Sequence, residues 1–448
     1  MNSTYCDQFH RWLEDRNPGQ AEFIQAVKDV TDDVYSLLDE QPLYQKQQVL
    51  YRLAEPDRII SFRVTWQDDA GEIRVNRGWR VQHSGAIGPY KGGIRFHPHV
   101  NESILKFLAF EQTFKNALTG LPIGGGKGGA DFDPKGCSDA EIMRFCQSFM
   151  SELYRHIGEN TDIPAGDINV GQREIGYMFG QYRRLSNQFA GAMTGKDIEF
   201  GGSEVRLEAT GFGLVYFVGE MLAARGETLE NKRVAISGAG NVALHAALKA
   251  CEEGAGIITL SSSRGVYHNP DGIDAKLVQE ALDDGSADST EVLQDMAERC
   301  GGDWQDNKTP WHFDCDIALP CATQNELDEQ DALALIDQSV LLIAEGANMP
   351  CTNAATRRFR EAGILHAPGK ASNAGGVALS GLEMTQNASF TQMEYDELDT
   401  QLKAIMRGIH RQCLQHGELD DGHVNYHMGA NVAAFKRVAN AILAQGVI

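Results

Sequence analysis

The chain has 448 residues, and at roughly 100–200 residues per domain this length predicts two or three domains. It carries 40 Lys and Arg against 62 Asp and Glu, and the net charge of −22 argues against general binding to nucleic acids or anionic membranes. The nine cysteines are scattered without a C-x-x-C pair, which argues against a disulfide framework or a zinc site. No segment resembles a signal peptide or a membrane span, so the sequence predicts a soluble, cytoplasmic protein.

The part of the chain before about residue 200 predicts a domain that mixes helices with strands. Apolar residues at helical spacing predict helices over 20–40 and 103–119, and a capping box at 138–141 predicts the start of a third. Apolar and polar residues alternate on both sides of a turn at 68–71, which predicts a β-hairpin over 60–81. This mixture is typical of an α/β or α+β domain.

From about residue 201 the pattern becomes strand, helix, strand. An apolar strand at 233–237, a helix at 241–253 and a second strand at 257–260 form a βαβ unit. Later apolar runs at 316–320 and 340–344 continue the rhythm of a parallel sheet. The sequence therefore predicts a second, α/β domain with its boundary near residue 200.

The turn after the first of these strands reads GAGNVA and contains Gly238, Gly240, Asn241 and Val242. It is a G-x-G-x-x-A run that follows a strand and opens a helix, which is the arrangement of a dinucleotide-binding turn. The glycines permit a tight turn, and the helix N-terminus favours a bound pyrophosphate. A strand–helix turn without a ligand is the alternative.

The end of the second strand indicates which dinucleotide is bound. An NAD site usually places Asp or Glu there to accept a hydrogen bond from the ribose 2′-hydroxyl. This chain instead has Ser261-Ser262-Ser263-Arg264, and hydroxyls with a guanidinium suit the 2′-phosphate of NADP. The acidic stretch at 280–284 opposes that interpretation, and a solvated loop is the alternative.

A glycine-rich segment at 121–129, expected to be a loop, places Lys127 among neighbours that have no side chains. It differs from a P-loop, which requires Gly at 121 and Ser or Thr at 128, where this chain has Leu121 and Gly128. Partial desolvation would lower the pKa of Lys127 from about 10.4 and make the amine usable in acid–base or electrophilic chemistry. A surface lysine in a flexible loop is the alternative.

Two further lysines and an acid complete the candidate chemistry. Lys91 stands beside a glycine pair, and Gln112 and Lys115 are three residues apart, so that they share one face of a helix. Several cations that converge in an acidic protein favour an anionic substrate such as a dicarboxylate, although each lysine alone is more often just a solvated charge. Asp167 follows a Pro/Gly turn, where general acid–base groups often stand, and an ordinary turn aspartate is the alternative.

The histidines predict no metal site. His97 and His99, and likewise His410 and His416, lie near each other in the sequence. Neither pair belongs to an H-E-x-x-H motif or to a Cys/His cluster, so a metal centre is not expected.

Taken together, these segments resemble the glutamate dehydrogenases of the Glu/Leu/Phe/Val dehydrogenase family, specifically the hexameric bacterial-type enzymes. The resemblance runs through essentially the whole chain. It is strongest in PYKGGIRFHP (89–98), in 106–136 around GGGKGG, in TDIPAGDINVGQREIGYMFGQYR (161–183), in LPCATQNE (319–326), in AEGANMP (344–350) and in APGKASNAGGVALSGLEM (367–384). Several such stretches in the right order are specific to this family.

The resemblance implies a two-domain α/β fold with an active-site cleft between the domains. Residues 1–200 would form a substrate-binding and oligomerisation domain, joined by a C-terminal helix at 426–448, and 201–425 a Rossmann-like dinucleotide-binding domain. The implied activity is the reversible oxidative deamination of L-glutamate to 2-oxoglutarate and ammonia with NADP, in a cytoplasmic homohexamer that binds neither nucleic acid nor membrane.

Roles for individual residues also follow from the resemblance. Lys91 and Ser380 would bind the side-chain carboxylate of the substrate, and Gln112 with Lys115 the α-carboxylate. Lys127 would activate water and polarise the 2-oxo group, while Asp167 would move protons to and from the nitrogen. The positions that match nucleotide contacts are Thr210, Gly238, Gly240, Asn241, Val242, Ala322, Asn348 and Asn373, to which the strand end adds Ser262 and Arg264.

The chain departs from this family pattern at the coenzyme. Many NADP-specific members have an Asp in the loop equivalent to 261–265 and basic residues near 284–290, where this chain has Ser262 and acidic residues. The same reaction with NAD, or with both coenzymes, therefore stays open. A branched-chain or phenylalanine dehydrogenase of the same superfamily also stays open, although Lys91 and Ser380 favour a carboxylate. A catalytically inactive metabolite sensor is disfavoured because Lys127 and Asp167 are both present.

Overall fold

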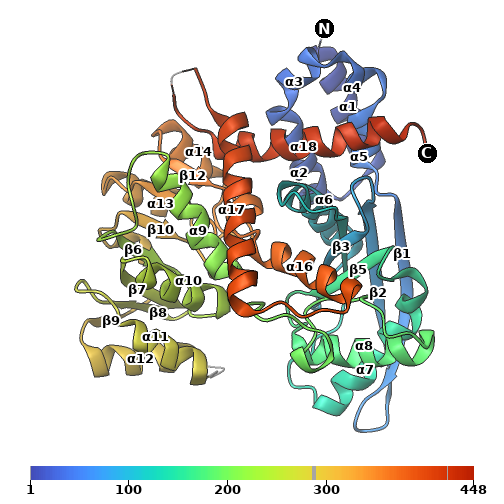
Figure 1. The fold of residues 1–448 in the computed structure, drawn as a ribbon, viewed down its shortest axis with the longest axis horizontal. Coiled ribbons are helices and arrows are strands. Elements are labelled where there is room, and N and C mark those ends of the chain that lie inside the picture. Colours follow the sequence, from blue (N-terminus) through green and yellow to red (C-terminus); the bar gives the residue numbers. More distant parts are fainter. Residues whose placement is uncertain (1, 285–288, 421) are drawn as a thin grey trace. The chain divides into compact units, whose positions relative to one another are not determined.

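The computed structural model describes residues 2–284, 289–420 and 422–448, which form two compact units (Figure 1). Unit 1 comprises the chain up to Arg206 together with Val377–Leu398 and Asn431–Ile448. Unit 2 comprises Leu207–Gly376 and Asp399–Ala430. Each unit contains its own sheet and its own buried apolar core.

These units differ from the expected domains mainly in Val377–Leu398, which lies in unit 1 and not with the nucleotide-binding residues. A buried ion pair explains the difference, because the carboxylate of Glu383 lies 2.8 Å from the amine of Lys196. Glu383 also accepts a hydrogen bond from the backbone N–H of Gly195. A contact between residues so far apart in the chain leaves no local signal in the sequence.

Unit 1 is built on one mixed, five-stranded sheet. Its strands are β1 Arg58–Gln67, β2 Ile73–Ser84, β3 Tyr90–Phe96, β4 Gly124–Ala130 and β5 Asp162–Gly166. Their order in the sheet is β1-β2-β4-β3-β5. The expected hairpin is confirmed, because β1 and β2 pair antiparallel, and β3 pairs parallel with both β4 and β5.

The helices of unit 1 include those expected from the sequence. They are α1 Asn2–Arg16, α2 Ala21–Asp33, α3 Tyr35–Glu40, α4 Pro42–Lys46, α5 Val49–Ala54, α6 Glu102–Leu118, α7 Asp139–Leu153 and α8 Gln172–Ser186, with short 3-10 turns at Tyr154–His156 and Ile198–Phe200. The helix expected over 20–40 divides at Val34 into α2 and α3. The capping box of Ser138 and Glu141 at the start of α7 is confirmed. Side chains of α7 and α8, among them Phe145 and Met178, pack on the sheet and form the core of this unit.

The expected loop around Lys127 is wrong, because Gly124–Ala130 is the buried strand β4. Glycine is required here by close packing and not by flexibility. A Cβ added to Gly125 would lie 1.9 Å from the hydroxyl of Thr113 on α6, and one on Gly92 of β3 would lie 1.7 Å from the carbonyl oxygen of Gly126. The missing side chains therefore let α6 and the neighbouring strand approach the backbone on both sides of Lys127.

Unit 2 is built on a seven-stranded sheet with a parallel main part. The strands are β6 Arg233–Ile236, β7 Gly256–Ser262, β8 Gly265–His268, β9 Asp303–Asp306, β10 Ile317–Leu319, β11 Leu342–Ala344 and β12 Leu365–Ala367. Their order is β12-β11-β10-β6-β7-β8-β9, and every pairing from β12 to β7 is parallel. The chain thus leaves β6 towards β7 on one side and later returns to β10 on the other, which makes the β6/β10 pair the topological switch point.

Helices flank this sheet. They are α9 Ala209–Ala223, α10 Asn241–Glu252, α11 Ala275–Asp284, α12 Ser289–Cys300, α13 Glu329–Asp337, α14 Asn353–Glu361 and the short α15 Gly369–Ser372, with a 3-10 turn at Pro310–His312. The expected βαβ unit is confirmed as β6, α10 and β7. Gly254 follows α10 with a φ of +85°, which glycine adopts without strain.

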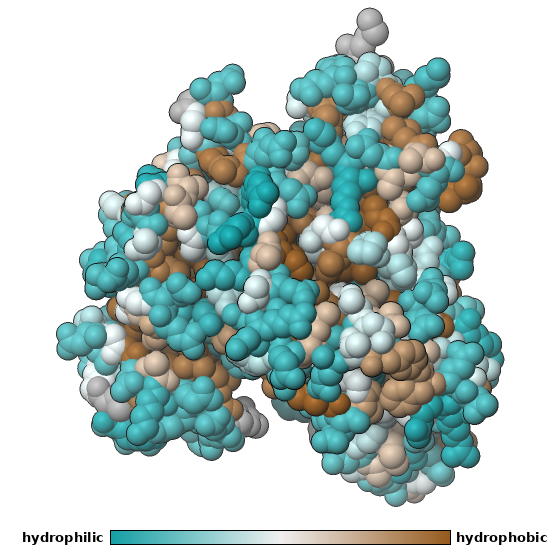
Figure 2. Space-filling model, in the orientation of Figure 1, coloured by the Kyte–Doolittle hydropathy of each residue, from teal (hydrophilic) through white to brown (hydrophobic). Residues whose placement is uncertain are grey.

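Three helices near the C-terminus contain residues of both units: α16 Gly375–Ser389, α17 Tyr395–Gly417 and α18 Tyr426–Gln445. None of the helices in the described part of the chain combines the length and the apolar composition that crossing a bilayer requires. Hydrophilic residues, coloured teal in Figure 2, spread over the visible faces of both units.

Candidate functional site

In unit 1 the sheet and one helix bring five of the predicted catalytic and substrate residues into one region. Lys91 lies in β3 and Lys127 in β4, and Asp167 directly follows β5. Gln112 and Lys115 lie on α6, which packs against β4. The helix is held close because Asn116 on α6 donates hydrogen bonds to the backbone oxygens of Lys91 and Gly124.

Lys127 and Asp167 form a buried ion pair. The Lys127 amine donates to one carboxylate oxygen of Asp167 at 2.9 Å, and Nε of Arg95 donates to the other at 2.6 Å. Burial alone would raise the pKa of Asp167, but the charges and hydrogen bonds of Lys127 and Arg95 outweigh it and hold that pKa well below its usual range. Burial lowers the pKa of Lys127, against the opposing effect of Asp167. Asp167 is therefore an ionised carboxylate in this state, and it becomes a stronger proton acceptor only when one of these two cations moves away.

Lys91 is buried, with 1% of its surface exposed, and its amine donates to the hydroxyl of Thr194 at 2.7 Å. Burial lowers the pKa of Lys91 to about 7, although the charge of Glu383 opposes the shift. Burial and the charge of Lys127 lower the pKa of Lys115 to about 8. The pKa values of both amines thus lie close to neutral pH, where a bound anion would decide whether the amines carry a charge.

Arg206 belongs to the same cluster and was missed by the sequence analysis. Its charge lowers the pKa of both Lys91 and Lys115, so the three cations lie close together. Its Nε is a buried atom without a hydrogen-bond partner among the described residues. A buried guanidinium N–H without an acceptor fits a site for a carboxylate oxygen. No sequence motif surrounds Arg206, so only its position in the fold identifies it.

Ser380 is also buried in unit 1, on α16. It stands three residues before Glu383, and residues at this spacing share one face of a helix. Lys91 donates to Thr194, and the N–H of the next residue, Gly195, donates to Glu383, so that face of α16 is directed towards the same cluster. The structure therefore places the predicted substrate residues of unit 1 in one region and adds Arg95, Thr194 and Arg206 to them.

In unit 2 the glycine turn lies at the carboxyl end of β6. Gly238 has a φ of +88°, and its N–H donates to the hydroxyl of Ser261 at the end of β7. A Cβ on Gly238 would approach Ala322 to 3.2 Å, whereas one on Gly240 would meet nothing within 4 Å. The backbone at the start of α10 is therefore open to a ligand, which fits the pyrophosphate of a dinucleotide at a helix N-terminus.

The other predicted nucleotide residues lie along the same edge of the sheet or on the helices behind it. Asn348 follows β11 and Asn373 follows α15, and the Asn373 amide donates to the side-chain oxygen of Asn348 at 3.1 Å. Asn241 opens α10 and donates to the backbone oxygen of Leu207. Thr210 lies in the first turn of α9, and Val242 follows Asn241 in α10. Parallel strands present their carboxyl ends at one edge, which is where ligands bind in such sheets.

The predicted phosphate-binding residues form the turn between β7 and β8. Ser262 shares a hydrogen bond of 2.8 Å with Thr290 in the first turn of α12, and the backbone N–H of Arg264 donates to the Ser262 hydroxyl. The acidic stretch opposes a phosphate less than the sequence suggests, because Glu280 forms an ion pair with Arg299. Residues 285–288, which belong to the segment compared with basic residues of other members, lie outside the described residues.

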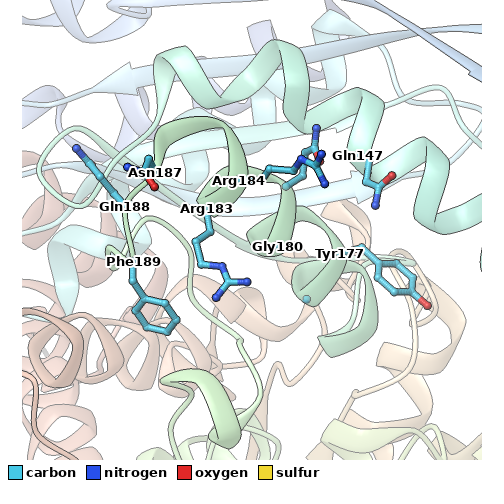
Figure 3. Close-up of a pocket in the computed structure, with 10 residues that line it drawn as sticks. Gln147, Tyr177, Gly180, Arg183, Arg184, Asn187, Gln188 and Phe189 are labelled. Carbon is cyan, nitrogen blue, oxygen red and sulfur yellow. The ribbon is translucent and has the colours of Figure 1, made fainter.

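A separate hollow of about 830 Å³ lies on the surface of unit 1, and none of the predicted site residues lines it. Figure 3 shows its walls, with Arg183, Arg184 and Phe189 near the end of α8 and Tyr177 nearer the start of that helix. Arg183 and Arg184 make it a polar surface hollow, distinct from the buried cation cluster.

A glycine turn at the switch point of a parallel sheet and a buried cation cluster in a second unit together define a class, the two-unit α/β dehydrogenases. The chain belongs to the Glu/Leu/Phe/Val dehydrogenase family. Residues 56–184 match the model of the Glu/Leu/Phe/Val dehydrogenase dimerisation domain, and residues 201–446 match that of the Glutamate/Leucine/Phenylalanine/Valine dehydrogenases.

Individual relatives are similar over almost their whole length. An NAD-specific glutamate dehydrogenase of Bacteroides fragilis is 54% identical over 97% of this chain and 98% of its own. An NADP-specific glutamate dehydrogenase of Escherichia coli is 53% identical over the full length of both chains. The crystal structure of Plasmodium falciparum glutamate dehydrogenase superposes with a TM-score of 0.97 at 44% identity, over all of this chain and 96% of that one.

Proposed function

We propose that this chain is a glutamate dehydrogenase that interconverts L-glutamate with 2-oxoglutarate and ammonia and uses NADP(H) as its coenzyme. The observation that carries this proposal is the cluster of Lys91, Lys115, Lys127 and Arg206 in unit 1, in a chain whose net charge is −22. Two buried amines, a partly buried one and a guanidinium with an unused N–H match a substrate with two carboxylates and a reacting oxygen or nitrogen.

Within this proposal the residues have separate roles. Lys91, Arg206 and Ser380 bind the distal carboxylate, while Gln112 and Lys115 bind the α-carboxylate. Both lysines gain a proton more readily when an anion is bound, because the anion offsets the cost of burying the charge.

Lys127 and Asp167 carry the chemistry in this proposal. The Lys127 cation stabilises negative charge that develops on the 2-oxo oxygen and orients the water that adds to or leaves the carbon. Asp167, held ionised by Arg95, accepts a proton from the substrate ammonium in the direction of deamination and returns it in the direction of amination. Release of Lys127 from Asp167 towards the substrate would leave Arg95 as the remaining partner of that carboxylate.

The residues of unit 2 fit a dinucleotide. Gly238, Gly240 and the start of α10 would bind the pyrophosphate, and Asn348 and Asn373 the part nearer the nicotinamide. When bound, the reduced coenzyme NADPH would supply the hydride to the substrate α-carbon in amination, and NADP⁺ would accept it in deamination. The absence of a carboxylate at the end of β7, the Ser262–Thr290 pair and the first turn of α12 favour a 2′-phosphate, because a helix N-terminus favours an anion.

NAD, alone or beside NADP, is the second candidate coenzyme. A relative as similar as the Bacteroides fragilis enzyme is described as NAD-specific. Overall similarity therefore does not separate the two coenzymes, and the strand end decides between them.

We also propose that the enzyme acts as a homohexamer in the cytoplasm. The match of 56–184 to a dimerisation domain supports self-association. The eight described cysteines are free thiols, which fits a reducing compartment.

The decisive experiment compares initial rates of NADPH and NADH oxidation with 2-oxoglutarate and ammonium. We expect NADPH to be preferred by at least about tenfold in kcat/KM, which corresponds to one charge-assisted hydrogen bond to the 2′-phosphate. Ser262→Asp with Arg264→Ala should abolish this preference through the KM for NADPH. A wild type that uses NADH better would contradict the coenzyme assignment, and inactivity with both would contradict the proposed reaction.

Substrate choice is tested separately. Lys91→Leu with Ser380→Val should reduce kcat/KM for glutamate strongly while leaving activity on norvaline equal or higher, because the pocket would keep only Arg206 as a cation and would become more apolar. An unchanged glutamate-to-norvaline ratio would favour a dehydrogenase of apolar amino acids instead.

A further inference from the structure

Three side chains of unit 2 form a continuous hydrogen-bonded chain that the proposed reaction does not use. His366 lies in β12, and its Nε2 lies 3.1 Å from Oε1 of Glu345, which follows β11. The other nitrogen of His366, Nδ1, lies 3.3 Å from Nε2 of His427 in the first turn of α18. Glu345 and His366 are buried, and His427 is partly buried.

Glu345 connects the two segments that carry the predicted nucleotide residues Asn348 and Asn373. Its Oε2 accepts a hydrogen bond of 2.7 Å from the N–H of Gly369, the first residue of α15. Its backbone oxygen accepts one of 2.7 Å from the hydroxyl of Ser372. The Asn373 amide in turn donates to the backbone oxygens of Gly346 and Ala347. The carboxylate thus ties the loop after β11 to the segment after β12.

The three residues could also be considered as metal ligands, since their ligand atoms lie within 4.8 Å of one another. The arrangement does not support this. His366 lies between the other two, with one ring nitrogen towards each, so it cannot turn the same nitrogen towards an ion shared by all three. The positive charges of Lys370 and Arg360 also act on His427 and oppose a cation there.

The hydrogen bonds among Glu345, His366 and His427 determine which protonation states these three side chains can adopt together. An ionised Glu345 accepts from Nε2–H of His366, so Nδ1 of a neutral His366 accepts from Nε2–H of His427. If His366 is protonated, His427 accepts instead, and one positive charge is still accommodated. If both rings are protonated, two N–H groups face each other and the bond between the rings is lost.

The surroundings of His427 disfavour its protonation. Burial and the charges of His366, Lys370 and Arg360 lower the pKa of His427 well below its usual value. The carboxylate of Glu345 and the thiol of Cys351 are further titratable groups here, and burial, together with the negative charge of Glu345, raises the pKa of that thiol well above its usual value. A group with a depressed pKa is protonated more readily when its site opens, so acid favours separation of His427 from His366 below the free imidazole value of about 6.5.

We propose that Glu345 is a positioning residue for the coenzyme-binding loops and that the His366–His427 pair makes this positioning sensitive to protons, so that coenzyme affinity falls as the pH decreases below neutrality. The inference rests on the proposed function, because it takes Asn348 and Asn373 as coenzyme contacts. Glu345 itself acts through these loops.

The test measures the direct binding of NADPH by fluorescence titration at about pH 5.5 and about pH 7.5, one unit on either side of the free imidazole pKa. The ratio of the two Kd values is compared between variants, which cancels the titration of the coenzyme's own phosphate. His427→Gln keeps a donor for His366 but cannot be protonated, so its ratio should be at least about threefold smaller than that of the wild type. His410→Asn is the matched control. His410 is hydrogen-bonded to Tyr426, which lies in the same turn of α18 as His427, but not to Glu345, His366 or His427.

Glu345→Gln tests the positioning role. A neutral amide cannot accept from all the donors around it, so the Kd and the KM for NADPH should rise at least about tenfold while kcat at saturating NADPH changes less. An equal loss in kcat would indicate a general structural defect and would overturn the role. If Glu345→Gln does not fold, the Kd ratio of His427→Gln still tests the sensitivity of coenzyme binding to protons.

Four results overturn the inference or its basis in distinguishable ways. A His427→Gln ratio equal to that of the wild type removes the proton sensitivity, and an equal effect of His410→Asn shows that any loosening of α18 suffices. Stoichiometric Zn²⁺ binding that His427→Gln abolishes would identify Glu345, His366 and His427 as a metal site. If neither NADPH nor NADH binds the wild type at either pH, the proposed function itself fails.

Discussion

At the scale of single residues, the site depends on charges that are kept out of water. Lys127 is 4% exposed, and its amine has Asp167 as its hydrogen-bonding carboxylate. Removing one partner from a buried ion pair leaves an uncompensated charge, which costs about 3–5 kcal/mol. Asp167 has a second cationic partner in Arg95, so loss of Lys127 leaves the charge of Asp167 partly compensated.

We therefore expect Lys127→Ala and Asp167→Asn to lower kcat at least about 100-fold, the low end for a positioned acid–base group. Both variants should keep the wild-type circular dichroism spectrum, because neither side chain belongs to the apolar core of unit 1. Steady-state kinetics measures the effect. Turnover close to that of the wild type would remove the residue concerned from the mechanism.

The lysines of the substrate cluster predict a pH dependence of anion binding. Burial lowers the pKa of Lys91 to about 7 and that of Lys115 to about 8, so each is charged below these values and loses its charge as the pH rises through them. The inhibition constant of glutarate, a dicarboxylate without a reacting group, should therefore be constant at low pH and increase above about pH 7–8.

This dependence should be weaker in Lys91→Arg, because a guanidinium stays protonated throughout that range. Glutarate isolates the effect from the titration of ammonium, which is a substrate of the full reaction. An inhibition constant that does not change with pH would show that these amines remain charged in the free protein.

At the scale of elements, β4 shows how a glycine run can serve close packing. A Cβ on Gly125 would lie 1.9 Å from the Thr113 hydroxyl and 2.6 Å from the Thr113 Cα, so it would meet the backbone of α6 and not only a movable side chain. Gln112 and Lys115 lie on the same helix. Any shift of α6 therefore moves two predicted substrate contacts.

Gly125→Ala should destabilise the protein by about 1–3 kcal/mol, the usual cost of overpacking, and should raise the KM for 2-oxoglutarate. Gly180→Ala is the matched control, because Gly180 lies within α8 and a Cβ there meets nothing within 4 Å. Alanine at that position should stabilise the helix by about 0.5–1 kcal/mol. Chemical denaturation compares the two, and equal stabilities would refute the packing argument.

At the scale of the whole molecule, unit 1 presents apolar residues at an edge of its sheet. Ile73 and Val75, at the start of β2 beside the edge strand β1, are 73% and 64% exposed in the single chain. Both lie in the segment that matches a dimerisation domain. Apolar side chains beside an unpaired strand edge favour contact with another chain.

Because we propose a homohexamer, sedimentation should give a mass near that of six 49.1 kDa chains for the wild type. Ile73→Glu with Val75→Glu should lower that mass, because buried carboxylates would oppose association. Leu333→Glu, in unit 2 and outside the matched dimerisation segment, should leave the mass unchanged. An unchanged hexamer in the double variant would exclude this edge from the assembly.

The sequence by itself determined the elements that depend on near neighbours: the β1–β2 hairpin, the capping box of α7, and the glycine turn between β6 and α10. Their signals are alternation, turn chemistry and caps, all of which act within a few residues. It also identified the family through motifs that follow one another along the chain.

Only the tertiary structure decided the surroundings of the chemistry. It placed Lys127 in a strand, joined Arg95 to Asp167 across 72 positions, and joined Lys196 to Glu383 across 187. It also revealed Arg206 and the chain from Glu345 to His427. Contacts between distant residues decide burial, and burial decides which groups keep a charge, so these features have no counterpart in local sequence patterns.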